Sequence, residues 1–547
     1  MKKKNKHIIK GVIAFIITCV MTVCMLPVLT DTAQAAITKT ESNTRLGTGE
    51  ITNPGTIRED HPEDAGKWCY VYYGHYFARP LKFRVLDKDA AEFGGETMLL
   101  DCDQMMDFQR FDDDSNVWDG SEIKAYLNGD FLAKTFTSTE QAAIAQSFKS
   151  QRIKGKDGIE CMGHYDFVPL TGEKIFLLDA FEITNKNYGY LDTHDVDASK
   201  VKSTTTTSPA WWLRSSKRND STHAGVVEKQ AGFMSYRECS KLNFSVSPAL
   251  NLSLSSILFS TKLSDNEFKL TIKDEAMSIA VSDLASNGNE ITVPFTSNGG
   301  ANRISVLITD KAYNASGAET KYYRPLSIEE GSAGASGYGV FTLPDTYIPS
   351  SDKVYIIAEN TNWNDKYTDY ASEPLLITIP AQVNKTVTFE SNGGSGSMEE
   401  QTVPRGVSVA LNENTFTQEG FTFTEWNTAA DGSGVSYADR GRIRISEPVI
   451  LYAQWKANSF DTLQTLIDGT ADGGVLTLGG DYLAITGESG LHIPSGKTIT
   501  LDLNGHTIDR GLKGKTAENE GYVIRNEGTL ILKDSAGGGK LTGGNAA

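Results

Sequence analysis

The stretch GFTFTEWNTAADGSG, residues 420–434, alternates aromatic residues with threonines and ends in a run of turn-forming residues. Such alternation predicts a β-strand with one buried face, because successive side chains of a strand point to opposite sides of the sheet. The glycines after Trp426 predict a loop that needs positive φ angles. Trp426 is then either the floor of a binding site or a core residue of a small domain, and its surroundings decide between these two interpretations.

The surrounding residues 385–456 contain the phrases VTFESNGG, GFTFTEWNT, DGSG and LYAQW in this order. A module of about 70 residues buries little surface, so each large aromatic side chain contributes much of its stability. We therefore predict that Trp426 is a core residue. The whole stretch resembles the Listeria–Bacteroides repeat, the internalin B-type repeat module, which implies a β-grasp-like fold. The aromatic residues expected to share packed sheet faces are Phe389, Phe421, Phe423, Trp426, Tyr452 and Trp455.

Residues 459–547 combine short apolar runs with Gly, Asn and Asp turns, so each strand can bury its apolar side only by stacking on the next coil. Leu501, Leu503 and Ile508 are expected inside this stack, and an amphipathic helix over SFDTLQTLID is expected to cap it. The phrase IPSGKTITLDLNGHTI resembles the opening coils of right-handed parallel β-helices of the pectate-lyase-like kind. Because the chain stops at GGNAA after about three coils, we expect it to be the front of a longer protein or a truncated gene model.

Residues 265–380 read as short alternating strands separated by turn signals, for example EITVPFTS, NRISVLITD and KVYIIAEN. This spacing predicts a β-sandwich of immunoglobulin type. The segment contains no cysteine, so its apolar inner faces alone must hold the two sheets together.

Residues 40–260 mix helices and strands and predict an α+β domain. FRVLDKD and ETMLLDC read as strands, whereas Ile123, Leu127 and Phe131 recur every four residues, as on one face of a helix. Thr137 and Glu140 form a capping box, which predicts the start of a second helix.

The phrases NVWDGSEIKAYLNGDFL, KIFLLDAF, WWLRSS and SPALNL follow one another within the same domain. In this order they resemble an extracellular bacterial family of unknown function that shares WWLRS and SPALNL elements. This family is similar to the C-type-lectin-like scaffold, which the formylglycine-generating enzyme also uses. That enzyme needs a reactive cysteine pair near its substrate groove. No such pair can be assigned here, so the resemblance implies a fold and no activity.

The chain begins with the basic residues of MKKKNKHIIK, an apolar stretch and the small-residue triplet AQA at 33–35. These features predict a secretory signal peptide over 1–35. The apolar stretch is also long enough for an uncleaved membrane anchor, an alternative that Pro27 and the AQA triplet disfavour. We expect a secreted or cell-surface bacterial protein with no membrane span beyond this segment.

The formal net charge of the chain is −17, and removal of 1–35, with its five lysines and one aspartate, changes it to −21. Nucleic-acid binding depends on phosphate neutralisation by Lys and Arg, so this charge argues against a nucleic-acid partner. It suits an extracellular protein, where like charges prevent aggregation.

Four cysteines lie beyond the signal segment: Cys69, Cys102, Cys161 and Cys239. An exported location permits up to two disulfides, and the three possible pairings stay open. The alternative is one disulfide or buried thiols. The cysteines and histidines lack zinc spacing, and the acidic run at 112–116 lacks the Gly and Glu of an EF-hand, so we expect a solvated turn there, with no metal and no cofactor. The alternative for this run is a calcium site of another geometry.

The most distinctive local cluster is Trp211, Trp212 and Arg214. An exposed aromatic pair can stack on a sugar ring while an arginine holds its hydroxyls or a carboxylate, so these residues are the candidate ligand-binding site. The alternative is that one tryptophan lies in the core and Arg214 forms an internal ion pair. The sequence contains no HExxH, GxSxG or glycine-rich phosphate loop, and we assign no catalytic residue.

The architecture favours a modular surface protein that binds host or matrix glycans or proteins, or cell-wall polysaccharide, with the small modules as spacers. An inference of this kind rests on association, because folds host many functions. One alternative is an extracellular polysaccharide-active lyase or hydrolase whose catalytic coils follow residue 547. Another is that the 40–260 domain is itself a lectin-like receptor.

Overall fold

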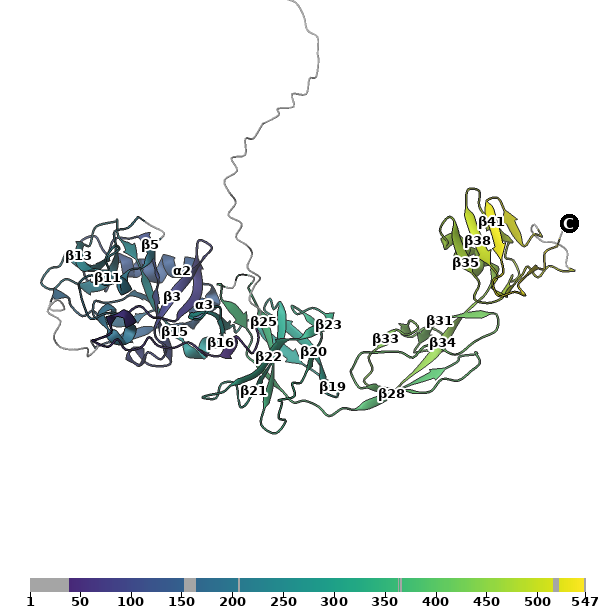
Figure 1. The fold of residues 1–547 in the computed structure, drawn as a ribbon, viewed down its shortest axis with the longest axis horizontal. Helices are drawn as coiled ribbons and strands as arrows, with labels where there is room; N and C mark the ends of the chain where they lie inside the picture. Colours follow the sequence, from purple (N-terminus) through teal and green to yellow (C-terminus); the bar gives the residue numbers. More distant parts are fainter. Residues whose placement is uncertain are drawn as a thin grey trace, which may run out of the picture.

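Strands make up most of the regular structure and form several separate sheets, which confirms the predicted multidomain, mainly β fold. The computed structural model describes residues 39–151, 164–204, 207–362, 364, 366–514 and 521–545. The predicted signal peptide and Cys161 lie outside these residues. Figure 1 shows four β-rich parts that follow one another in sequence order, ending in a stack of short strands.

The first part, residues 39–262, contains two sheets and one large apolar core. Every residue of the ETMLLDC strand from Thr97 to Cys102 is buried, which explains why this strand lacks a polar face. The main sheet runs β2 (Tyr70–Tyr76), β3 (Arg79–Asp87), β4 (Thr97–Cys102), β15 (Pro248–Ser253) and β6 (Ile144–Ala145), with β9 (Ile175–Leu177) also on β15. The second sheet runs β10 (Ser203–Thr204), β5 (Gln104–Phe108), β14 (Ser245–Val246), β11 (Ala210–Ser216), β12 (His223–Glu228) and β13 (Met234–Glu238). Two short pairs complete this part: β1 (Thr44–Leu46) with β16 (Ile257–Lys262), and β7 (Ser147–Lys149) with β8 (Leu170–Glu173).

An interrupted helix packs its predicted apolar face on this core. It runs through α1 (Glu122–Tyr126), a π-helical turn η3 (Leu127–Phe131) and α2 (Leu132–Thr135). Ile123, Leu127 and Phe131 are fully buried, as their spacing predicts. The capping box is also confirmed, because Thr137 and Glu140 bond each other's backbone at the start of α3 (Ser138–Ala143). Short 3-10 turns are η1 (Pro62–Asp64), η2 (Ala91–Phe93), η5 (Glu182–Thr184), η6 (Lys186–Tyr188), η7 (Ala198–Lys200) and η8 (Leu254–Ser256).

The second part is a sandwich of two antiparallel sheets. Apolar residues from both sheets, among them Ile291, Val306 and Ile356, form one core, so the alternation in the sequence is explained by inward-facing side chains. One sheet contains β22 (Thr320–Pro325), β21 (Arg303–Thr309), β25 (Lys353–Asn360) and β27 (Leu375–Ile377). The other contains β18 (Ser278–Val281), β19 (Ala285–Asn287), β20 (Glu290–Asn298), β24 (Ser336–Thr342) and β23 (Ser327–Gly331).

A continuous hydrogen-bonded sheet joins the first part to the sandwich. Strand β17 (Glu267–Lys273) pairs in parallel with β2 of the first part and with β26 (Asp369–Ala371) of the sandwich. Strand β26 pairs in turn with β25. No flexible linker separates the two parts at this point, because the sheet crosses the predicted boundary near residue 265.

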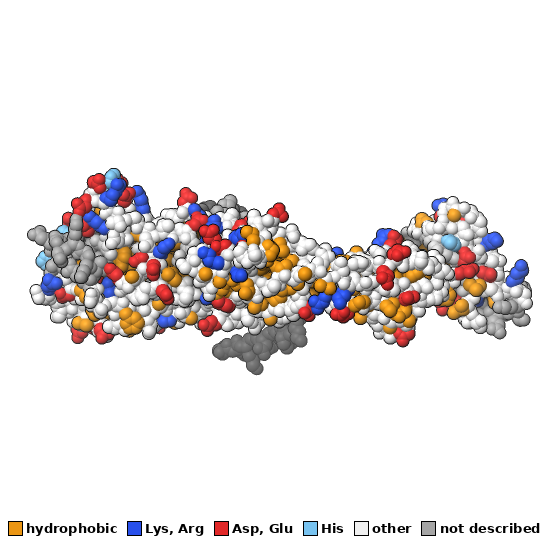
Figure 2. Space-filling model, turned by 90° about the horizontal axis from the view of Figure 1, so that it is seen from below, with side chains coloured by type: hydrophobic (Ala, Val, Ile, Leu, Met, Phe, Trp, Pro, Cys, Tyr) orange, Lys and Arg blue, Asp and Glu red, His pale blue; other side chains and the backbone are white. Residues whose placement is uncertain are grey.

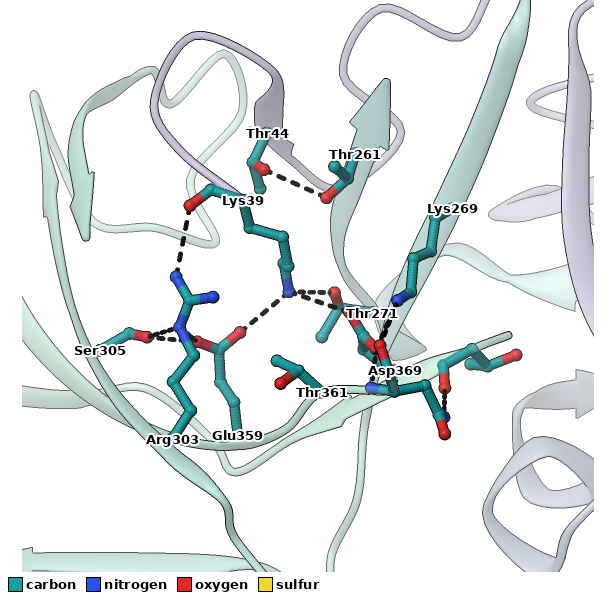
Figure 3. A network of polar contacts seen from close by, with 12 residues as sticks. Lys39, Thr44, Thr261, Lys269, Thr271, Arg303, Ser305, Glu359, Thr361 and Asp369 are labelled. Carbon is teal, nitrogen blue, oxygen red and sulfur yellow. Dashed lines mark hydrogen bonds and ion pairs between the residues drawn. The ribbon is translucent and has the colours of Figure 1, made fainter. Parts of the chain in front are cut away.

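Buried charges lie at the same joint, and we call Lys39, Lys269, Arg303, Glu359 and Asp369 the junction network (Figure 3). Lys39 Nζ lies 2.9 Å from Glu359 Oε1 and 3.5 Å from Asp369 Oδ2. Lys269 pairs with Asp369 at 2.9 Å, and Arg303 with Glu359 at 3.5 Å. Both carboxylates are fully buried, and buried charges are tolerated only when they are paired in this way.

The third part, residues 384–457, confirms that Trp426 is a core residue. Its side chain is fully buried, and the rings of Phe389 and Phe423 lie 4.9 Å and 5.1 Å from it. A register shift after Phe423 turns Trp426 to the same side of the sheet, although their sequence parity differs. Phe421 is 40% exposed, so its predicted place in the core is wrong. The sheet runs β29 (Gln401–Pro404), β28 (Asn384–Glu390), β34 (Val449–Ala457), β31 (Phe421–Asn427) and β32 (Ser436–Tyr437), and β30 (Val409–Ala410) pairs with β33 (Arg442–Ile443).

The fourth part is a stack of parallel coils capped by helix α4 (Phe460–Gly469). Leu501, Leu503 and Ile508 are buried in the stack, as predicted. Asn504 and Gly505 both have positive φ and form the predicted turn. Its three parallel sheets are β35 (Gly474–Thr477), β38 (Thr498–Asp502) and β41 (Thr529–Lys533); β36 (Tyr482–Leu483), β39 (Thr507–Asp509) and β42 (Lys540–Thr542); and β37 (Leu491–Ile493) with β40 (Ile524–Asn526).

Candidate functional site

The predicted binding residues Trp211, Trp212 and Arg214 lie on β11 with fully buried side chains. Trp212 Nε1 donates to the Gln109 carbonyl at 2.8 Å, and the Lys202 ammonium lies 4.2 Å from the Trp211 ring centroid. Neither indole has a face open to a sugar. This arrangement favours the core interpretation of the cluster.

Arg214 uses all five of its N–H donors inside the protein. Nε donates to the Val168 carbonyl at 3.0 Å, and Nη1 donates to the Leu177 carbonyl at 2.6 Å. The terminal nitrogens also bind Asp179 at 2.9 Å and both oxygens of Glu182 at 2.8 Å. Both acids belong to the LLDAFEI phrase, so the two most recognisable motifs of this domain meet in one buried ion cluster.

The charge of Glu182 is fixed by its neighbours. Burial opposes ionisation, but Arg214 and Lys149 outweigh it and lower the pKa of Glu182 to about 2. Lys149 Nζ lies 2.9 Å from Glu182 Oε1. Burial and the adjacent Glu182 raise the pKa of Asp179 above its usual value. The cluster therefore stabilises the fold and has no free group for a ligand.

No disulfide joins the three described cysteines to one another. Cys102 and Cys239 are buried, and burial raises the pKa of each thiol to about 12. Cys69 is half-buried. Cys161 lies outside the described residues, so a disulfide through it stays a prediction. Among the described residues, no group of three or more His, Cys, Asp or Glu side chains is arranged to hold a metal ion.

A site that the sequence did not suggest lies at the turn between β2 and β3. The two turn residues, Phe77 and Ala78, both have positive φ, 48° and 59°. Two-residue hairpins with this geometry usually carry Asn-Gly or Gly-Gly, because a Cβ atom is strained there. Phe77 is also 80% exposed, the highest value among the large apolar side chains described. We call Phe77 and Ala78 the hairpin tip.

A cavity of about 380 Å³ opens beside the hairpin tip, and we call it the hairpin-tip pocket. Its floor is apolar, since Leu81 and Met106 are buried. Its rim carries a guanidinium, an amide and a carboxylate. The lining residues are Tyr76, Phe77, Arg79, Leu81, Gln104, Met106 and Asp107.

Two tyrosines orient the carboxylate of this pocket. The hydroxyls of Tyr76 and Tyr126 both donate to Asp107 Oδ2. Burial raises the pKa of Tyr76 to about 12, and the hydrogen bond to Asp107 adds to this shift. Both phenols therefore stay protonated donors at neutral pH, and Asp107 is held in one orientation. The Tyr76 ring also contacts Phe77 edge-on, with centroids 4.5 Å apart.

The sandwich holds the hairpin tip in its strained conformation. Tyr367, from the loop between β25 and β26, donates its hydroxyl to the Ala78 carbonyl at 2.6 Å and packs on the His75 ring at 5.5 Å. The same loop is fixed at Thr368, whose hydroxyl donates to Glu140 Oε1 at 2.6 Å. The loop ends at Asp369 of the junction network (Figure 3). The joint between the two parts thus positions the pocket.

Sequence reasoning missed this site because its turn carries no turn signal. The phrase YFARP has neither Gly, Asn nor Asp between its two strands. The sequence did contain a signal, namely the absence of turn residues between two strands. Phe77 and Ala78 occupy positions where a two-residue hairpin normally needs glycine or asparagine.

Charged side chains are mixed along the molecular surface. Figure 2 shows acidic and basic groups interspersed on the face it presents, with apolar side chains gathered most densely over the sandwich. Among the described residues, no helix is long and apolar enough to cross a membrane.

Two family models match parts of the chain. The domain of unknown function DUF6273 matches residues 94–254, a range that contains the WWLRS and SPALNL phrases. The Listeria-Bacteroides repeat domain matches residues 386–454, which confirms the predicted repeat. The chain is therefore modular, and this repeat points to the bacterial surface.

Two proteins of Evansella cellulosilytica are similar over short stretches. One, named as a Gly-rich membrane protein, is 37% identical over 90 residues, which is 15% of this chain and 10% of the relative. The other, named as a membrane protein, is 31% identical over 100 residues, 17% of this chain and 15% of the relative. The chain spans only these small shares of both curated relatives. A solved β-glucuronidase of Ruminococcus gnavus aligns at 14% identity over 35% of this chain and 33% of the enzyme, and its TM-score of 0.13 carries no argument about fold or activity.

Proposed function

We propose that this chain is a bacterial surface protein that binds glycans through the hairpin-tip pocket. The observation that carries the proposal is an exposed phenylalanine in a strained turn beside a polar-rimmed cavity. Strain of this kind persists only where the surrounding structure over-determines it, and it clusters at ligand sites. The bond from Tyr367 to Ala78 supplies such a constraint here.

The chemistry of the pocket suits a pyranose ring. A sugar has an apolar C–H face and a rim of hydroxyls. Phe77 offers an exposed ring for the C–H face, whereas Asp107 and Gln104 offer fixed acceptors and a donor for the hydroxyls. Because the tyrosines already orient Asp107, little ordering entropy remains to be lost on binding.

The size of the pocket favours a glycan over a protein partner. A cavity of about 380 Å³ lies at the lower end of the range for small-ligand sites. A stable protein interface buries roughly 800 Å² on each partner, which a single small pocket cannot supply. The repeat and the coils then act as spacers that carry the first part away from the cell.

The proposal is tested with a glycan array probed by residues 36–547, the chain without its predicted signal peptide, which we call the mature chain. We expect binding to a subset of glycans and at least tenfold weaker binding by Phe77→Ala, because the ring face is lost. Phe148→Ala is the matched control, since Phe148 is also exposed, at 56%, in the same part but outside the pocket. Circular dichroism checks that both variants fold. No bound glycan, or equal loss in both folded variants, would overturn the proposal.

A further inference from the structure

The hairpin-tip pocket contains an arginine that the rest of the described protein leaves unpaired. Arg79 directly follows the tip, is exposed and lines the cavity. Within residues 39–151, 164–204 and 207–262 every other arginine forms an ion pair with an acid. These pairs are Arg45 with Glu50, Arg58 with Asp64, Arg84 with Asp103, Arg110 with Asp113 and Glu122, Arg214 with Asp179 and Glu182, Arg218 with Asp166, and Arg237 with Glu228.

The one carboxylate in the pocket does not serve as the partner of Arg79. Asp107 accepts from Tyr76 and Tyr126, and it forms no ion pair with Arg79. The pocket thus presents a free guanidinium and, separately, an oriented carboxylate. A guanidinium binds planar carboxylates through two parallel N–H donors, which gives both charge and geometry.

We propose that the glycan bound at this pocket carries a carboxylate, as uronic and sialic acids do, and that Arg79 receives it. This inference rests on the proposed function of the pocket. The sugar carboxylate pairs with Arg79, the C–H face lies on Phe77, and hydroxyls on the far side of the ring bond Asp107 and Gln104. The acidic sugar supplies the charge partner that Arg79 does not find among the described residues.

A carboxylate fits this pocket better than a sulfate or phosphate ester. Arg79 is the only cation among the lining residues, which all lie in the described part of the chain. Sites for sulfate and phosphate gather several donors or backbone N–H groups around a tetrahedral anion. One arginine beside an acid matches a single planar anion whose ring also has hydroxyls to donate.

The test uses the mature chain and paired glycans on one array. The pairs are galacturonic acid and galactose on the same linker, N-acetylneuraminic acid and its methyl ester, and galactose with and without a sulfate. We expect at least tenfold tighter binding of each free carboxylate than of its neutral partner, and no such preference for sulfate.

Arg79→Gln should remove this preference, and Arg79→Lys should restore part of it. Lys88→Gln is the charge-matched control, because Lys88 follows β3 outside the pocket and its loss should change nothing. Equal binding of acidic and neutral partners that still depends on Phe77 would overturn the inference and leave the proposed function standing. A preference for sulfate, or a carboxylate preference that survives Arg79→Gln, would also overturn it. No glycan binding at all would remove both.

Discussion

Arg214 illustrates how a residue cluster typical of a ligand site can belong wholly to the interior. Its guanidinium satisfies all five donors on two carbonyls and two acids, Asp179 and Glu182. Arg79 has the opposite surroundings, because it lies at a pocket rim and no acid among the described residues pairs with it. The two residues have the same chemistry, and only the number of internal partners distinguishes the structural one from the candidate ligand-binding one.

The buried cluster predicts a specific dependence of stability on pH. The folded pKa of Glu182, about 2, lies below its usual value of 4.5, so its charge stabilises the folded state above pH 4.5. This contribution is lost as the pH falls from 4.5 towards 2. The pKa of Asp179 is shifted the other way, so its contribution opposes this loss.

Glu182→Gln should therefore flatten the fall, between pH 5 and pH 2.5, in the denaturant midpoint of the transition in which the first part and the sandwich unfold, although it lowers stability at neutral pH. Glu399→Gln, an exposed carboxylate in the repeat, should leave the slope unchanged. Chemical unfolding followed by tryptophan fluorescence measures both. A slope that Glu182→Gln leaves intact would show that other acids cause the acid sensitivity.

At the scale of the element, the sequence predicted the features that depend on residue spacing within a single helix or strand. The capping box at Thr137 and Glu140, the helical face around Leu127 and the burial of Trp426 all agree with the structure. Each depends on spacing within one element, which a sequence displays directly. Phe421 was misplaced because it is the first residue of β31, where its side chain stays 40% exposed.

Features that depend on residues far apart in the chain could not be predicted from the sequence. Strand β17 pairs with β2 from about two hundred residues earlier and with β26 about a hundred residues later. The hairpin tip also escaped, because the contact that holds Ala78 comes from Tyr367. When a contact from another domain imposes the conformation of a turn, the turn itself need not carry the usual Gly, Asn or Asp.

The hairpin tip predicts a trade between stability and binding. The positive φ of Ala78 strains the folded state by about 1–3 kcal/mol, and Ala78→Gly removes this strain. The new glycine also raises the conformational entropy of the unfolded chain, which lowers stability by a smaller amount. We expect this variant to be more stable by about 1 kcal/mol and to keep binding. Replacing Phe77-Ala78 with Asn-Gly should stabilise the hairpin further and abolish glycan binding.

Thermal unfolding and the glycan array measure the two properties separately. Wild type and Ala78→Gly serve as the matched pair, because they differ only in the side chain at position 78. A double variant that loses stability would mean that the tip is not strained. A double variant that keeps full affinity would mean that Phe77 does not contact the ligand.

At the scale of the whole molecule, one sheet joins the first part to the sandwich, and two smaller modules follow them. The sheet and the junction network unite the first part with the sandwich. Between sandwich and repeat, Arg444 pairs with Glu329 and Glu330 at 3.1 and 3.2 Å, and Arg405 pairs with Asp283 at 3.8 Å. We therefore expect the first part and the sandwich to unfold together, apart from the repeat and the coils.

Lys39→Met tests this coupling, because it removes the cation between two buried carboxylates, Glu359 and Asp369. Breaking a buried pair in this way costs about 3–5 kcal/mol. Calorimetry of the mature chain should show the joint transition lowered by several degrees, with the transitions of the later modules unchanged. Lys273→Met is the control, because Lys273 pairs with Glu373 at the surface, where an ion pair contributes about 0–1 kcal/mol. Equal effects of both variants would contradict a junction held by buried charge.

The position of the bound glycan tests the account most directly. We would introduce 4-fluorophenylalanine at position 77 or, as a reference, at position 148, and titrate each mature chain with the best glycan from the array while recording ¹⁹F NMR spectra. We predict a saturable change in the chemical shift of the label at position 77, and no change at position 148. The dissociation constant from this titration should equal the one measured for the same glycan on the array. Saturable binding that leaves the signal of position 77 unmoved would contradict the hairpin-tip pocket as the glycan site.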